Sequence, residues 1–166
     1  NQLLVESPNL PESDWSRVIK VEEGDGYKTL SNKLDGYEIT VPSSWDVSGV
    51  AARDGGHEIA SEDLVLRIFV LDKIEQAQAF FPLSTQFETI ETATGRIYRA
   101  LFQPTADNID SKGDVLEVPV ENSLVTGYIF PAAKETYLVS CLTTGISFKE
   151  LSSHCEKQIL TFKVLK

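Results

Sequence analysis

The feature that most constrains this chain is a two-residue alternation of apolar and polar side chains, which begins at Tyr27 and dominates the sequence from there. Such alternation is typical of β-strands that bury one face. Several connections between these segments are much shorter than the dozen or more residues that a parallel crossover needs, so we expect a mainly antiparallel sheet. In chain order, the predicted strands are YKTLSN, GYEITVP, VSGVAA, LVLRIFVL, FETIET, RIYRALFQ, VLEVPV, LVTGYIF and TYLVSCLT.

A short helix is predicted between the fourth and fifth of these strands. Residues 73–81 (KIEQAQAFF) are rich in helix formers, and Pro82 ends the segment because proline cannot continue a helix. Ile74, Ala77 and Phe81 recur at helical spacing and share one face, which we expect to pack on the sheet.

A longer helix is predicted near the C-terminus, over residues 147–160 (SFKELSSHCEKQIL). Ser147 and Glu150 have the spacing of a capping box, and Ile146 is placed to pack on Leu151 as a hydrophobic staple. The apolar stripe of this helix consists of Phe148, Leu151, Cys155 and Ile159.

The order of these elements indicates an α+β domain. Strands come first, helices lie between and after them, and no regular βαβ alternation is present, so we expect a mainly antiparallel β-sheet covered by helices, an α/β/α sandwich. The 166 residues suit one domain, which we place at residues 26–166. Residues 1–25 carry two prolines and six acidic residues, which is typical of a tether or an irregular lead-in. Within that lead-in, Trp15, Val18 and Ile19 could dock on the domain as one helical turn.

The charge of the chain excludes several kinds of partner. With 25 acidic and 15 basic residues the net charge is 15 − 25 = −10, which would repel a nucleic-acid backbone. The basic residues are scattered singly, so we expect no direct lipid binding by the domain either. The longest apolar stretches fall well short of the roughly 18 residues that span a bilayer. A protein partner remains the expected class.

The two cysteines are predicted to form a disulfide. Alternation places Cys141 on the same strand face as Tyr137 and Val139, and Cys155 lies on the apolar stripe of the following helix. A tight connection at Thr144 and Gly145 folds that helix back onto the strand, which brings the two Cα atoms near disulfide distance. The alternative is a pair of buried free thiols.

The compartment follows from the cysteines and from the start of the chain. Disulfides persist in oxidising compartments. The chain contains no Met and opens on Asn1, so we expect a trimmed fragment. Either a leader was removed, or an experimenter chose where the fragment begins. Together these observations favour an exported protein whose membrane tether precedes Asn1.

Neither histidine predicts a catalytic site. His57 lies in a polar, Gly-rich segment and is expected to be a solvated loop residue. His154 adjoins Cys155, but neighbouring helical residues point about 100° apart, which disfavours a Cys-His dyad. The sequence contains no GxSxG, HExxH, CxxC or Gly-rich phosphate loop, so no cofactor is expected.

An acidic segment, TADNIDSKGDVLE, is the one candidate for metal binding. Its carboxylates at Asp107, Asp110, Asp114 and Glu117 are ligands that calcium prefers, but their spacing does not match an EF-hand. A solvated hairpin loop is the expectation we favour, with calcium binding as the alternative.

The segment GYEITVPSSWDV, residues 36–47, resembles the opening hairpin of PsbP-like domains, which share their fold with Mog1. The matching residues are Gly36, Tyr37, Ile39, Val41, Pro42 and Trp45. The end of the chain, a strand, a capped helix and the closing ILTFKVL, is similar to that family too. The resemblance implies an antiparallel sheet sandwiched by helices, and many bacterial members look like anchored lipoproteins of unknown role. It transfers no functional residue to this chain.

Two functional hypotheses follow. The first is an exported, membrane-tethered, non-enzymatic binding or scaffolding domain of bacterial lipoprotein type, with the acidic lead-in as a spacer. The second is a hydrolase or metal-dependent enzyme whose site is assembled from residues distant in sequence, such as His57 with carboxylates of the 107–117 loop.

Overall fold

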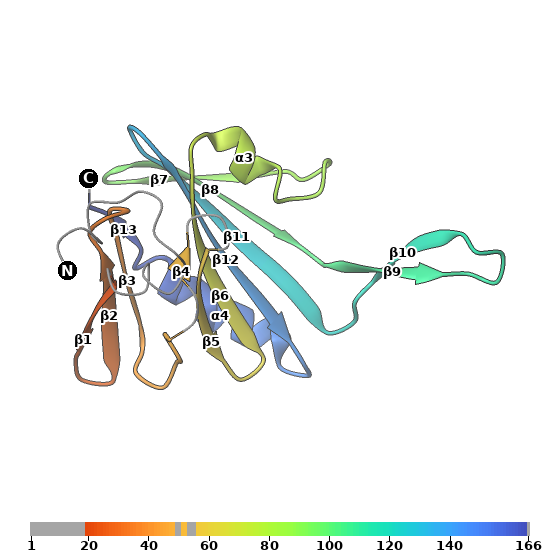
Figure 1. Ribbon diagram of the computed structural model, residues 1–166, viewed down its shortest axis with the longest axis horizontal. Helices are drawn as coiled ribbons and strands as arrows, with labels where there is room; N and C mark the ends of the chain where they lie inside the picture. The colour runs from red at the N-terminus through yellow and green to blue at the C-terminus, as the bar shows by residue number, and fades with distance from the viewer. Residues whose placement is uncertain (1–18, 49–50, 53–55, 166) are drawn as a thin grey trace.

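The computed structural model describes residues 19–48, 51–52 and 56–165, and these form three antiparallel sheets and two helices (Figure 1). The four-stranded sheet has the order β1-β2-β3-β13, and the seven-stranded sheet has the order β4-β5-β6-β12-β11-β8-β7. The remaining pair, β9 and β10, forms a separate ribbon. The smaller sheet comprises β1 (Ile19–Glu23), β2 (Tyr27–Asn32), β3 (Tyr37–Pro42) and β13 (Lys163–Val164). The larger one comprises β4 (Ala51–Ala52), β5 (Gly56–Ser61), β6 (Leu64–Leu71), β7 (Glu88–Thr92), β8 (Gly95–Phe102), β11 (Ser123–Pro131) and β12 (Thr136–Thr144).

The two helices cover opposite faces of the seven-stranded sheet. On β12, Val139 and Cys141 belong to the core that contains residues of α4 (Phe148–Ile159). Leu138 points to the other face and packs with Ala77 of α3 (Ile74–Gln78). Successive strand residues point to opposite faces, so β12 is buried on both sides, and the α/β/α arrangement follows. The mainly antiparallel α+β fold predicted from the alternation is confirmed.

The main core lies between the two sheets and α4. Tyr37, Ile39 and Val41 alternate onto one face of β3, as predicted, and are buried there. They pack with residues of β5, β6 and β12 and with Trp45, which covers the core. A second core lies under α3, where Phe81 makes edge-to-face contacts with neighbouring phenylalanines.

Four strands were not predicted, namely β1, β5, β9 and the short β13 that follows α4. The lead-in contributes β1, which pairs with β2, so Ile19 opens a strand; the helical turn expected with Trp15 and Val18 lies outside the described residues. The segment around His57 forms β5, and the acidic segment contributes β9 (Thr105–Ile109), which pairs with β10 (Val115–Pro119). Of VSGVAA, Ala51 and Ala52 form β4, and residues 49–50 lie outside the described part.

The start of α4 differs from the prediction. Ser147 occupies the N-cap position but its side chain makes no capping hydrogen bond, and Ile146 is exposed instead of packing on Leu151. Cys155 and Ile159 are buried as expected, whereas Phe148 and Leu151 are half-buried. Within the described residues no helix has the length and apolar character to cross a membrane.

Candidate protein-binding surface

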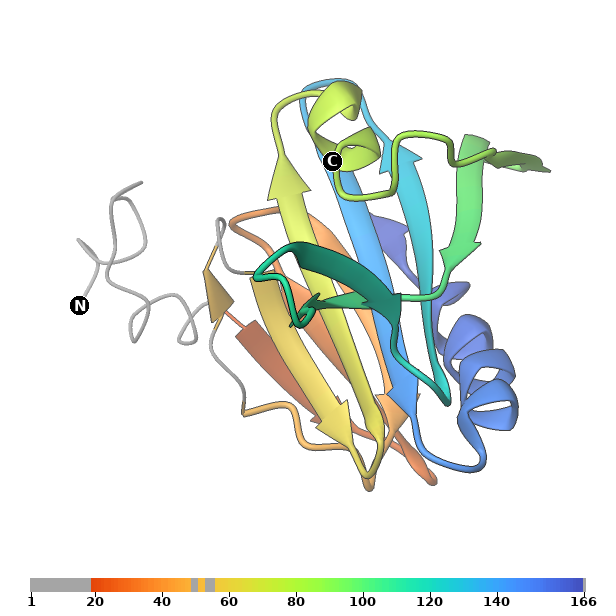
Figure 2. The same cartoon turned by 90° about the vertical axis from the view of Figure 1, so that its right-hand side faces the viewer.

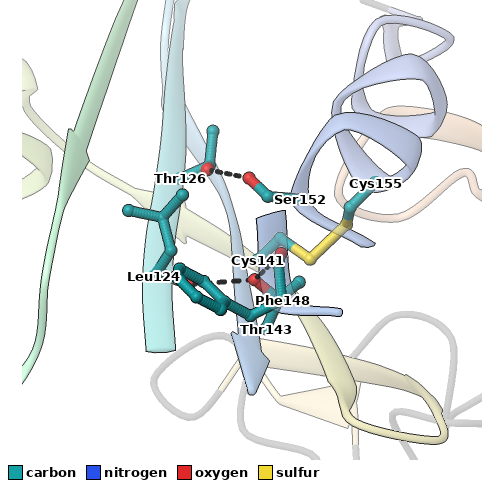
Figure 3. Close-up of a disulfide and its surroundings, with 7 residues drawn as sticks. All are labelled: Leu124, Thr126, Cys141, Thr143, Phe148, Ser152 and Cys155. Atoms are coloured by element: carbon teal, nitrogen blue, oxygen red, sulfur yellow. Dashed lines mark hydrogen bonds between the residues drawn. A yellow bond between two sulfur atoms is a disulfide. The ribbon is translucent and has the colours of Figure 1, made fainter. Parts of the chain in front are cut away.

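The structure joins Cys141 of β12 to Cys155 of α4 in a disulfide, with 6.7 Å between their Cα atoms (Figure 3). Both residues are almost fully buried. Two further contacts hold α4 on the sheet beside this bond. The hydroxyls of Thr126 and Ser152 lie 2.9 Å apart, and the Thr143 hydroxyl donates to the Phe148 carbonyl at 2.9 Å. The disulfide region is therefore a packed structural joint between helix and sheet.

A polar cluster at Glu156, next to Cys155 in sequence, also links α4 to the sheet. The Arg99 guanidinium of β8 donates to the Glu156 carboxylate, and the Tyr128 hydroxyl donates to the same oxygen, Oε1, at 2.7 Å. Arg99 also pairs with Glu88 at 3.2 Å. Burial alone would raise the pKa of the Glu156 carboxyl, but the hydrogen bonds from Arg99 and Tyr128 outweigh it and hold that pKa below its usual range. These groups satisfy one another, which is typical of a structural network.

The two histidines occupy separate environments. His57, predicted to be solvated, is instead buried in β5. Its Nε2 lies 3.3 Å from the Val47 carbonyl, and its buried Nδ1 has no hydrogen-bond partner among the residues that the structure describes. Burial lowers the pKa of this imidazole, so it is neutral at pH 7. His154 is exposed on α4, with its ring edge-to-face on Trp45.

The acidic segment does not meet His57. Asp107, Asp110 and Asp114 lie on the β9–β10 ribbon, which projects away from the sheet that contains β5 (Figure 1). Throughout residues 19–48, 51–52 and 56–165, no three His, Cys, Asp or Glu side chains gather in a group that could hold a metal ion. The arrangement on which the enzyme hypothesis depended is thus not assembled by the described residues.

Asp110 has a clear structural role at the tip of the ribbon. Its Oδ1 accepts hydrogen bonds from the backbone N–H groups of Lys112 and Asp114, at 2.8 and 2.9 Å. Gly113 completes the turn with a φ of 87°, a conformation that other residues rarely adopt. The solvated hairpin loop expected here is therefore a short, well-defined turn, and paired strands occupy the rest of the segment.

The base of the ribbon is also fixed by hydrogen bonds. The Val120 N–H donates to the Pro104 carbonyl at 2.9 Å, and the Val120 carbonyl accepts from the side chains of Gln103 and Ser123 at 2.9 and 2.6 Å. The ribbon therefore has side-chain and backbone hydrogen bonds at both its turn and its base, although it has no core of its own.

The ribbon exposes large apolar side chains along its whole length. The exposed fractions are 68% for Ile109, 62% for Val115, 49% for Leu116, 40% for Val118 and 38% for Val120. Every residue of both strands is exposed, and Figure 1 shows the ribbon standing clear of the body. In Figure 2, where this side faces the viewer, the ribbon lies in front of the seven-stranded sheet. An isolated two-stranded hairpin is marginally stable in water, so this apolar surface contributes little to the fold and is available for contact.

The two faces of the ribbon differ in chemistry. Directly opposed residues share a face, so Leu116 and Val118 lie together with their partners Asn108 and Ala106. The other face carries Asp107 opposite Glu117, and Ile109 opposite Val115 nearer the tip. Residues 105–119 contain four carboxylates and one lysine, which gives a net charge of 1 − 4 = −3. One face of the ribbon is therefore apolar apart from Asn108, and the other combines two carboxylates with the exposed apolar side chains of Ile109 and Val115.

Comparison with known proteins supports the fold. No protein-family model matches the sequence, and no curated protein matches it. The solution structure of cyanobacterial PsbP (CyanoP) from Synechocystis sp. PCC 6803 is similar, with a TM-score of 0.58 and 13% identity over 85% of this chain and 94% of that one. The crystal structure of the Saccharomyces cerevisiae Ran-binding protein Mog1p gives a TM-score of 0.45 and 9% identity, covering 89% and 97%. The likeness to CyanoP shows that this chain has a PsbP-like fold.

Proposed function

Starting from a PsbP-like fold, we propose that this protein is a non-enzymatic binding or scaffolding domain whose β9–β10 ribbon contacts a partner protein. The observation that carries the proposal is the projecting ribbon, whose apolar side chains are exposed on both strands. The hydrogen bonds at its turn and base favour one ribbon geometry, which reduces the entropy that binding must cost.

The partner surface follows from the chemistry of the ribbon. Leu116 and Val118 require an apolar surface, and the carboxylates of Asp107 and Glu117 require cationic side chains on the opposite wall. A second copy of this chain fits poorly, because each copy has a net charge of −10 and each ribbon is acidic. We therefore propose a partner protein with an apolar groove flanked by Lys or Arg.

We further propose that the domain is exported and tethered to a membrane, as a lipoprotein of the bacterial type. In this proposal the acidic lead-in is the spacer and residues 26–166 are the single domain. The β1 strand of the lead-in adds to the sheet of that domain. The Cys141–Cys155 disulfide supports an oxidising compartment. Cell fractionation tests this: the protein should be recovered with the membrane and be degraded by protease added outside the cytoplasm. Recovery in the cytoplasm with two alkylatable thiols would contradict it.

Matched variants test the role of the ribbon. The wild-type protein, the double variant Leu116→Ser/Val118→Ser and the control Ile146→Ser would each be cross-linked in the native host and purified. Ile146 is a fully solvated apolar residue outside the ribbon, so its substitution matches the loss of exposed apolar surface. The ribbon variant should lose a cross-linked product that the wild type and the control both retain. Equal recovery by all three proteins would contradict the proposal.

A further inference from the structure

The β9–β10 ribbon has two free backbone edges. It is a separate two-stranded sheet, so each of its strands has one edge that pairs with no other strand among the described residues. Hydrogen bonds at the two ends of the ribbon show which residues face these edges. The Asp110 N–H donates to the Asp114 carbonyl at 2.9 Å at the tip, and the Val120 N–H donates to the Pro104 carbonyl at 2.9 Å at the base.

These two bonds fix the direction of every backbone group in the ribbon. In an antiparallel ladder, residue pairs that exchange hydrogen bonds alternate with pairs that do not. Counted along the register from either end, Ala106 and Asn108 bond to β10, whereas Thr105, Asp107 and Ile109 do not. The N–H and C=O groups of these last three residues therefore point outward from the free edge of β9.

The free edge of β10 is poorer in donors than that of β9. Its outward positions are Val115, Glu117 and Pro119. Proline has no N–H, and proline on an edge strand is a common device against the addition of another strand. No proline occupies the three outward positions of β9, so that edge presents three N–H and three C=O groups to an added strand.

A third strand would also complete the ribbon as a sheet. Two strands alone are marginally stable in water, whereas three strands with an apolar face are stable together. Addition of an extended segment to a sheet edge is an established mode of peptide recognition, in which backbone hydrogen bonds give affinity and alternate side chains give specificity. The edge of β9 has the free backbone groups that this mode requires.

The side chains of the ribbon determine which segment fits. A residue directly opposite Asp107 on an added strand shares a face with the carboxylates of Asp107 and Glu117, so Lys or Arg is favoured there. The residues on either side of that cation point to the other face, where Leu116 and Val118 are exposed. Apolar side chains are favoured at those two positions.

The same carboxylates disfavour pairing between two copies of this chain. In two β9 strands joined edge to edge and antiparallel, the register that pairs all three outward positions places Asp107 directly opposite Asp107 of the other copy. Like charges at opposed positions destabilise a sheet. The edge therefore favours a cationic strand from a different protein.

We propose that an extended segment of the partner protein adds to the free edge of β9 as a third, antiparallel strand. Its central residue is Lys or Arg, opposite Asp107, and the residues on both sides of this cation are apolar. This inference rests on the protein-binding role proposed above and specifies how the ribbon binds.

Hydrogen exchange of the ¹⁵N-labelled protein, measured by NMR with a synthetic peptide, tests strand addition. The peptide is acetyl-GIVKVTG-amide, whose lysine lies opposite Asp107 when the peptide pairs antiparallel with β9. The peptide should slow exchange at the outward amides of Thr105, Asp107 and Ile109. The outward amides of Val115 and Glu117, on the other edge, are the internal control and should exchange at an unchanged rate.

Two N-methylated peptides separate backbone pairing from contact through side chains. N-methylation of the lysine removes an N–H that points toward β9 and should abolish the protection. N-methylation of the valine that follows it removes an N–H that points away from β9 and should leave the protection in place. The two peptides have the same composition and charge, so only the edge that carries the methyl group differs.

A matched pair of proline variants tests the assignment to β9. Asp107→Pro and Glu117→Pro each remove one carboxylate and one outward N–H, and neither removes a hydrogen bond between the two strands. Asp107→Pro should abolish the protection, whereas Glu117→Pro should retain it. Asp107→Asn keeps the N–H and should weaken peptide binding by up to about fivefold, as expected for an exposed ion pair. Unchanged amide shifts at Asn108 and Leu116 would show that the ribbon is intact in each variant.

Three results would overturn the inference. The first is unchanged exchange at all three β9 amides with millimolar peptide. The second is equal protection by the two N-methylated peptides, and the third is equal protection in the two proline variants. If any of these occurs while the Leu116→Ser/Val118→Ser variant still loses its cross-linked product, strand addition is wrong and the binding role stands. If that variant keeps the product, the binding role itself fails.

Discussion

Removal of the Cys141–Cys155 bond, by reduction or by the double substitution to alanine, should lower the stability of the folded protein measurably. The two residues are 14 apart in sequence, and closing a loop of about 15 residues contributes about 3 kcal/mol in the chain-entropy model. For a domain of this size, 1 kcal/mol corresponds to roughly 2–4 °C in Tm, so the expected loss is about 6–12 °C. Because both cysteines are buried between β12 and α4, the alanine variant also loses packing and should melt no higher than the reduced wild type.

The assay is thermal melting followed by circular dichroism, with and without a phosphine reductant. The double-alanine variant is the matched control, and the reductant should leave its Tm unchanged. Thiol titration of the unreduced, denatured wild type should find no free thiol. Two reactive thiols per chain, or a Tm that reduction does not change, would refute the reasoning.

Three further predictions concern the packing and pH dependence of the domain. A Cβ at Gly127 would lie 2.4 Å from the Phe81 ring, so Gly127→Ala should destabilise the protein by about 1–3 kcal/mol in urea unfolding. The lowered pKa of His57 means that the unfolded state binds its proton first, so stability should fall as the pH drops below 6.5, and His57→Leu should flatten that part of the profile. The lowered pKa of Glu156 acts at lower pH: its stabilisation is present above about pH 4.5 and is lost as the pH falls through the folded-state pKa. Glu156→Gln, which removes this carboxylate from Arg99 but leaves the pair with Glu88, should remove this dependence.

The fold was predictable because most of its strands bury one face or both. In β3, Tyr37, Ile39 and Val41 alternate with polar residues and point into the core, so the period in the sequence reports burial directly. In β6 nearly every residue is apolar, and the strand has apolar clusters on both faces. The same argument placed Cys141 and Cys155 in one interface, because the two-residue period of the strand and the helical period of the following segment each point to it independently. Both residues lie where the strand and helix periods put them.

Where the predictions were wrong, tertiary packing overrode the local pattern. The segment GHEIAS contains polar residues at positions that the sheet buries, so His57 was expected to be solvated although β5 pairs with β6 along its length. The capping box at Ser147 had the right spacing, but the backbone at that residue does not aim its hydroxyl at the first turn of α4.

The ribbon was the hardest feature to predict. The alternation in VLEVPV is the same as that of a half-buried strand, and nothing local shows that Leu116 and Val118 lie on a ribbon that packs on nothing within the described residues. One signal was present: the carboxylates of Asp107 and Glu117 interrupt both strands at opposed positions, which a strand buried on that face would not tolerate. In this segment the acidic residues suggested metal ligands, whereas the apolar residues between them are the ones that the structure leaves exposed.

Photo-cross-linking from a single ribbon position tests the binding role most directly. Benzoylphenylalanine would replace Leu116 in one variant and Leu83, the most exposed large apolar residue on the body, in the other. Irradiation in the native host should give a discrete cross-linked protein from position 116 and none from position 83, and a Glu117→Lys change should abolish it. No product from position 116, or the same product from both positions, would contradict a ribbon that binds a partner.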